Sequence, residues 1–148
     1  MNPFDLKSIL LARHAQHVVL IHFPIALFLV SVAFDFAAQW WNKAAFTAVA
    51  YYNLTLAAAS SLPVVATGLM AWHWQLEGQK LKGTLLLHLV MGLASTVLIW
   101  LIWLVHFRSR KPERTLPAYR LPLEIVAAAV VALTAHLGGF LSGVNAGV

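Results

Sequence analysis

Long apolar runs separated by short polar segments dominate the chain. The four runs are residues 18–40, 45–72, 83–105 and 121–141. Each run meets the length of about 20 residues that is needed to cross the hydrocarbon core of a bilayer. Backbone N–H and C=O groups in lipid must find partners within the protein, so runs of this length predict membrane-spanning helices.

The polar segments between the runs are short, at residues 41–43, 75–82 and 107–120. Short connections join antiparallel neighbours in helix bundles. We therefore expect an all-α protein, an integral membrane up-down four-helix bundle, with one domain over residues 1–148. Residues 1–17 contain several apolar positions and predict a short interfacial segment before the first span.

The composition agrees with a membrane location. Hydrophobic residues make up 61% of the chain and charged residues 10%, whereas soluble domains have about 25% charged residues. The absence of cysteine excludes disulfides, thiolate metal sites, iron–sulfur clusters and covalent c-type haem attachment. The net charge of +5 is explained by orientation in the membrane, and no nucleic-acid partner is expected.

The lysine and arginine residues are unequally shared between the two sides of the predicted bundle. Side A holds both termini and the 75–82 segment, with Lys7, Arg13, Lys80 and Lys82. Side B holds the other two connections, with Lys43, Arg108, Arg110, Lys111, Arg114 and Arg120. Basic residues are in excess in cytoplasmic loops, so side B is expected in the cytoplasm and both termini outside. Interfacial belts are predicted near the span ends by Trp40, Trp41, Trp72, Trp74, Trp100 and Trp103.

Two prolines and one acid lie inside the apolar runs. Pro24 and Pro63 each remove a backbone hydrogen bond and predict kinks in the first and second spans. Asp35 lies in the first span near side B. We expect it to make a structural hydrogen bond or ion pair with Asn53, Tyr52 or an arginine of the 107–120 segment, and a proton relay is the alternative.

Six of the seven histidines belong to the side-A half of the predicted bundle. With a rise of about 1.5 Å per residue, His22, His88 and His136 lie about 8–10 Å below the side-A boundary on three different spans. Ionisable residues in spans are costly and usually face the bundle interior or water. His17 opens the first span and is the expected fourth member of this set. The remaining histidines are expected at the interface: His14, His73 and His106.

Imidazoles on facing helices are the axial ligands that haem b requires, so we expect one or two haem b groups. His22 and His88 lie on diagonal spans and are predicted to pair as ligands of one haem. His136 would pair with His17 or His73, or would hydrogen-bond to a histidine that binds the haem. Small residues near the histidines would make room for the macrocycle: Gly68, Gly138 and Gly139.

Two other uses of the histidines remain open. Copper is one, because Met70 and Met91 would add thioether ligands to imidazoles. Hydrogen bonding between helices, without any cofactor, is the other. Zinc hydrolysis is disfavoured because the chain has no HExxH motif and no carboxylate in the histidine half of the spans.

Several motifs resemble a family of bacterial membrane proteins catalogued as domain of unknown function 2231. Residues 17–27 resemble its HPxxVHFPIAL signature, with Val18 in place of the proline. Phe34-Asp35, Thr67-Gly68, His88 and His136-Leu-Gly-Gly139 resemble its later motifs. Two acids that the family often has, before Trp72 and after Gly139, are missing here. The resemblance implies a small four-helix, haem-binding protein of the bacterial inner membrane.

The combined expectation is an electron-transfer subunit rather than a stand-alone enzyme. Its partners would be the lipid bilayer, a larger membrane redox complex or a periplasmic redox protein, and quinol. With side B in the cytoplasm, both termini and the histidine half would face the periplasm. The alternatives are a non-catalytic accessory subunit of a larger complex and a copper-handling membrane protein.

Overall fold

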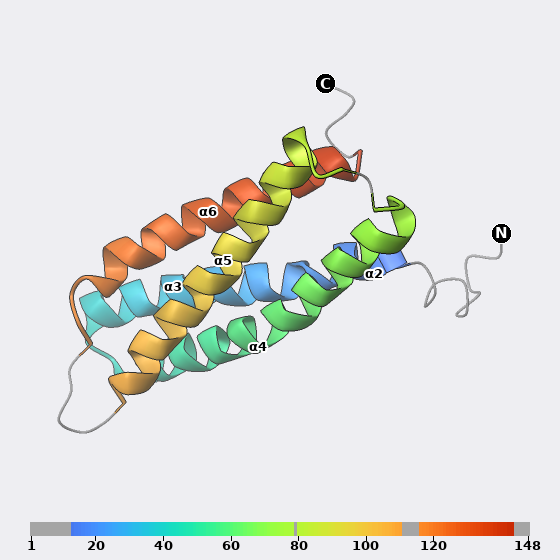
Figure 1. Ribbon diagram of the computed structural model, residues 1–148. Helices are drawn as coiled ribbons and strands as arrows, with labels where there is room; N and C mark the ends of the chain where they lie inside the picture. The colour runs from blue at the N-terminus through green and yellow to red at the C-terminus, as the bar shows by residue number, and fades with distance from the viewer. Residues whose placement is uncertain (1–12, 79, 111–115, 144–148) are drawn as a thin grey trace.

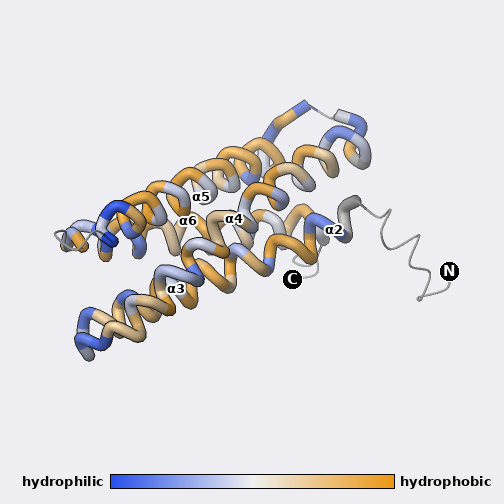
Figure 2. The backbone as a smooth tube through the Cα atoms, turned by 90° about the horizontal axis from the view of Figure 1, so that it is seen from below, coloured by the Kyte–Doolittle hydropathy of each residue, from blue (hydrophilic) through white to orange (hydrophobic). Residues whose placement is uncertain are grey.

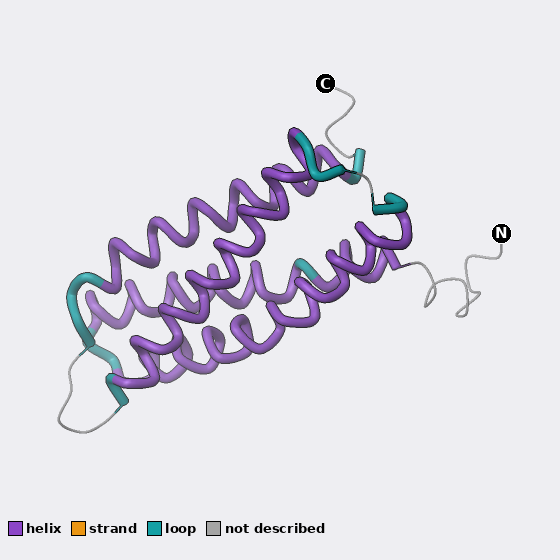
Figure 3. Tube along the Cα trace, viewed as in Figure 1, coloured by secondary structure: helices purple, strands orange, loops and turns teal. Residues whose placement is uncertain are grey.

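The computed structural model describes residues 13–78, 80–110 and 116–143. Its helices are α2 (Arg13–Leu20), α3 (His22–Trp41), α4 (Ala44–Gln75), α5 (Gly83–Arg108) and α6 (Arg120–Leu141). Turns and loops join them, and the described residues contain no strand (Figure 3). Of the predicted interfacial segment, residues 1–12 lie outside the described part of the chain.

Four stretches of helix are long and apolar enough to cross a bilayer. They are Gln16–Trp41, Ala44–Trp74, Gly83–Arg108 and Arg120–Leu141. Each contains one of the four predicted spans almost whole, extended by a few residues at its ends. The prediction of an all-α membrane bundle is therefore confirmed.

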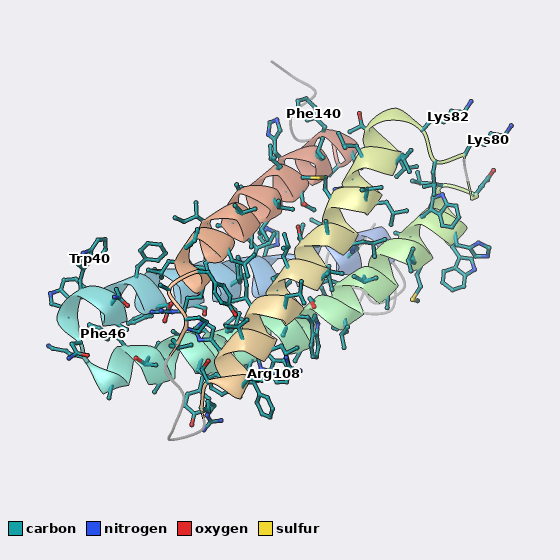
Figure 4. The ribbon with its side chains drawn as sticks, turned by 60° about the vertical axis from the view of Figure 1, so that its left-hand side comes forward. Trp40, Phe46, Lys80, Lys82, Arg108 and Phe140 are labelled. Atoms are coloured by element: carbon teal, nitrogen blue, oxygen red, sulfur yellow. The ribbon has the colours of Figure 1, made fainter. Side chains whose placement is uncertain are left out.

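The helices run alternately up and down (Figure 1). The α3–α4 and α5–α6 connections lie at one end, and the α4–α5 connection lies at the other end with the start of α2. Figure 4 shows Trp40 and Arg108 at the first end and Lys80 and Lys82 at the second. Hydrophilic residues gather near both ends, and hydrophobic residues fill the length between them (Figure 2). The two ends are the predicted sides B and A.

The first span is interrupted near side A, between α2 and α3. The N–H of Ile21 reaches the carbonyl of His17 at 3.0 Å, and that of Ile25 reaches Ile21 only at 3.4 Å. Pro24 has no N–H to offer the carbonyl of Leu20, which explains the break. The other proline has a milder effect, because α4 continues through Pro63 as one helix.

The bundle consists of two hairpins, the first made of α2, α3 and α4 and the second of α5 and α6. Three helices contribute buried residues at alternating spacings of four and three. These are Pro24, Phe28, Ser31 and Asp35 on α3, Ser95, Ile99, Ile102 and His106 on α5, and Arg120, Glu124, Ala127 and Val131 on α6. This spacing keeps one seam of each helix facing its neighbours at small crossing angles.

The buried core is unevenly distributed along the bundle. We call residues 13–27, 62–78, 80–94 and 132–143 the side-A half, and the other described residues the side-B half. Sixteen buried residues belong to the side-B half, whereas the side-A half has two, Pro24 and Ala71. At side A the second hairpin also separates from α2 and α4 (Figure 1). Packing between the hairpins is therefore concentrated toward side B.

Two tryptophans join the hairpins by hydrogen bonds. Trp100 Nε1 donates to Ser61 Oγ at 3.3 Å, and Trp103 Nε1 donates to Thr55 Oγ1 at 3.1 Å. Both side chains are half-buried and contact the other hairpin, and their place in an interfacial belt stays a prediction. The sequence of an apolar helix end does not reveal whether a tryptophan there faces a lipid headgroup or a neighbouring helix. Trp40, Trp41 and Trp74 are exposed near span ends, as a belt requires.

Candidate functional site

His17 rests against the glycine of the facing helix in the first hairpin. A Cβ built on Gly68 would lie 2.9 Å from Cε1 of the His17 ring. Nδ1 of His17 lies 3.2 Å from Thr67 Oγ1, and this hydroxyl already donates to the carbonyls of Pro63 and Val64. When the single proton of this hydroxyl goes to one of these carbonyls, the hydroxyl accepts from His17 Nδ1, and the neutral ring then has its lone pair on Nε2.

His88 repeats this arrangement in the second hairpin. A Cβ built on Gly138 would lie 3.1 Å from its Cε1. Nδ1 of His88 lies 3.1 Å from the backbone carbonyl of Thr134. A carbonyl can only accept, so Nδ1 carries the proton and Nε2 carries the lone pair. An Nδ1–H donated to a backbone carbonyl is the usual orientation of a histidine whose Nε2 binds a metal.

The other two predicted ligands, His22 and His136, are exposed. Nδ1 of His22 lies 3.4 Å from the carbonyl of Val19, and the ring of His136 meets that of Phe140 edge-on at 4.9 Å between centroids. Gly139, beside His136, is half-buried. The described residues contain one group of three or more close metal-ligand side chains, and none of the four predicted ligands belongs to it. They share the side-A half, two half-buried and two exposed.

The histidines that were expected at the membrane interface differ in burial. His73 is exposed beside Trp74, and the His14 side chain lies outside the described part of the structure. The interfacial assignment of His106 was wrong, because its side chain is 3% exposed. Its Nε2 lies 3.0 Å from Glu124 Oε1, on the facing helix α6. The partner is 18 positions away along the chain, so helical periodicity could not reveal it.

Asp35 forms the ion pair expected with an arginine of the 107–120 segment. Arg120 Nε donates to Asp35 Oδ2 at 2.7 Å, and Arg120 Nη2 donates to Gln39 Oε1 at 3.1 Å. Both side chains are almost fully buried. The other two expected partners of Asp35 are wrong, because Asn53 donates to the carbonyl of Val49 and Tyr52 is exposed. The pair links α3 to α6, and so one hairpin to the other.

The two buried pairs form one cluster at side B. Ligand atoms of Asp35, His106 and Glu124 all lie within 4.8 Å of one another. Asp35 Oδ1 and Glu124 Oε2 are buried and have no hydrogen-bond partner. The sequence analysis missed Glu124, although it follows Arg120 by one helical turn. An acid four residues after an arginine at a span end was the available signal.

Four antiparallel membrane helices, with ionisable side chains buried between them, define the chain as a small polytopic membrane protein. The chain belongs to the family described as "Predicted membrane protein (DUF2231)", whose model matches residues 13–146. The resemblance inferred from the sequence is thereby confirmed. No curated protein and no solved structure matches the chain.

Proposed function

We propose that the protein is a b-type cytochrome subunit of the bacterial inner membrane that holds haem b in the side-A half. The carrying observation is the hydrogen bond from His88 Nδ1 to the carbonyl of Thr134. It orients the ring and leaves Nε2 with the lone pair that an axial ligand uses. The bond from His17 Nδ1 to Thr67 Oγ1 supports the same role for a second histidine on the other hairpin.

The donor set fits haem b better than a structural metal ion. His17 and His88 come from different hairpins, and both belong to the side-A half, in which few residues are buried. Gly68 and Gly138 support these two rings, so we assign them to positioning the ligands. His22 and His136 supply a second pair of imidazoles on neighbouring helices, which keeps the proposal at one or two haems.

Haem b, when bound, supplies one-electron transfer, with a potential tuned by its ligands and surroundings. The chain's own contribution is to orient the imidazoles and to surround the group with apolar side chains. The excess of basic residues at side B favours a periplasmic side-A half and periplasmic termini. The electron partners would then be quinol, a periplasmic redox protein or a larger membrane redox complex.

The test is a reduced-minus-oxidised absorption spectrum of the purified protein and of two variants. We expect a Soret band in the native chain that is lost in His88→Asn and retained in His73→Asn. An asparagine amide still donates to the Thr134 carbonyl from nearly the position of Nδ1 but offers no Nε2 ligand. A correctly inserted native protein without a Soret band would overturn the proposal.

One observation favours a second candidate, an accessory subunit whose histidines only connect helices. The His17–Thr67 contact joins α2 to α4, and the His88–Thr134 hydrogen bond joins α5 to α6. In that case the native protein lacks a Soret band, and His88→Asn keeps the stability and complex assembly of the native chain. Copper in the purified protein, again without a Soret band, would identify the copper-handling alternative instead.

A further inference from the structure

The second buried site lies at the opposite end of the bundle from the proposed haem ligands. It contains four ionisable side chains that are at most 6% exposed: Asp35, His106, Arg120 and Glu124. They come from α3, α5 and α6. Buried charges persist only when they are paired and hydrogen-bonded. The cluster is therefore a place where the number of bound protons is restricted by charge balance.

The charges can be balanced group by group. Arg120 is always protonated, and at 2.7 Å from Asp35 Oδ2 it keeps that carboxylate ionised. This pair is neutral. The remaining pair, His106 and Glu124 with Nε2 and Oε1 3.0 Å apart, is neutral only when it holds one proton more than a neutral imidazole beside a carboxylate. Without this proton it leaves one buried negative charge, and with a second one it leaves one positive charge.

The surroundings strengthen this requirement. Asp35 Oδ1 and Glu124 Oε2 are buried and have no hydrogen-bond partner. A negative charge on these oxygens therefore has no donor to stabilise it. On α4 the half-buried tyrosine of this half is Tyr51, whose ring lies 4.4 Å from the Arg110 guanidinium. The α4 residues buried in this half are apolar or hydroxylic, such as Ala50, Leu54 and Ser61. Arg120 is thus the cation that the structure places inside the cluster.

We propose that His106 and Glu124 together form a binding site for one exchangeable proton. The proton is shared along the Nε2–Oε1 line, either on the imidazole beside a carboxylate or on the carboxyl beside a neutral imidazole. The site is close to the side-B water, because His106 lies two residues before the end of α5 and Glu124 four residues into α6. Gln39, an exposed residue that accepts from Arg120, extends the polar connection toward that surface.

Charge balance makes an unusual prediction for the two single variants. In Glu124→Gln, His106 should remain neutral at all pH values at which the protein stays folded, because a proton would leave a buried positive charge. In His106→Gln, Glu124 should keep the proton itself and remain a neutral carboxylic acid at neutral pH. Exposed carboxyl groups are ionised there, so this state is diagnostic.

Infrared spectroscopy of the protein in lipid nanodiscs tests the carboxyl group, and NMR of 15N-labelled histidine tests the imidazole. We expect a protonated-carboxyl band at neutral pH in His106→Gln that disappears in His106→Gln/Glu124→Gln. Glu77→Gln, which removes an exposed carboxyl group outside the spans, should leave that band unchanged. In the native chain, which needs no variant to fold, the pair should hold this one proton at neutral pH.

Three results would overturn the proposal. The first is an ionised Glu124 in His106→Gln at neutral pH. The second is a native pair without this proton at neutral pH, with a neutral His106 imidazole beside an ionised Glu124. The third is stoichiometric binding of Mn²⁺ or Zn²⁺ that Glu124→Gln abolishes, because the cluster would then be a metal site. These three results do not depend on whether the protein shows a Soret band, so they test the proton site separately from the haem proposal.

Discussion

The side-A and side-B halves use ionisable residues in opposite ways. At side B, ionisable groups from three helices are buried against each other, and most of the apolar core surrounds them. At side A, histidines rest on glycines within each hairpin, and few side chains are buried. The comparison indicates that side B holds the hairpins together, whereas each half-buried side-A histidine contacts its own hairpin.

The largest expected effect comes from removing one charge of the side-B cluster. Arg120→Met removes the buried cation that pairs with Asp35, and we expect a loss of about 3–5 kcal/mol in the free energy of unfolding. Unfolding in detergent by denaturant would measure it. Arg120→Met/Asp35→Asn also removes the unpaired acid and should recover most of the loss. A loss below about 1 kcal/mol, typical of surface ion pairs, would contradict the comparison.

A smaller effect is expected where the histidines rest on glycine. In Gly68→Ala and Gly138→Ala the new methyl groups would lie 2.9 and 3.1 Å from Cε1 of His17 and His88. Each ring must shift and weaken its Nδ1 hydrogen bond, which costs about 1 kcal/mol. Gly92→Ala is the matched control, because its methyl group would lie 3.8 Å from Thr134. Equal stability of all three variants would show that the glycines do not position the rings.

A still smaller effect is expected at the tryptophans between the hairpins. Trp103→Phe removes the indole N–H that donates to Thr55 Oγ1, but this hydroxyl keeps its own bond to the carbonyl of Tyr51. No buried group is stranded, so we expect a loss of about 0.5–1 kcal/mol. Trp40→Phe, at a position that is 76% exposed, should change nothing. Similar losses in both variants would assign Trp103 to the membrane interface rather than to the joint.

Cysteine probes should leave stability unchanged and report which half faces which side of the membrane. The chain has no native cysteine, and Glu77 and Ala118 are exposed in connections at opposite ends. With side B in the cytoplasm, an impermeant thiol reagent should label Glu77→Cys in intact cells and spare Ala118→Cys. The reverse pattern would move the histidine half to the cytoplasm and exclude periplasmic redox partners.

The sequence by itself determined the number of spans, their alternation and the family. These features depend on the length of apolar runs, on the shortness of loops and on motifs contiguous in the chain. It also indicated that Asp35 would need a polar partner, with Asn53, Tyr52 or an arginine after the third span as candidates, because a lone acid inside a span is costly. The kink near Pro24 was predicted from proline chemistry, but the same chemistry at Pro63 leaves α4 continuous.

Only the tertiary structure decided which face of each helix is buried, and with it the site. In lipid both faces of a span are apolar, so hydropathy does not separate the packed face from the lipid-facing one. The rotation of the helices about their axes places His106 and Glu124 together inside the bundle. The position of His106 along its span had predicted an interfacial residue. The same rotation half-buried His17 and His88 but exposed His22 and His136, although all four share one half of the bundle.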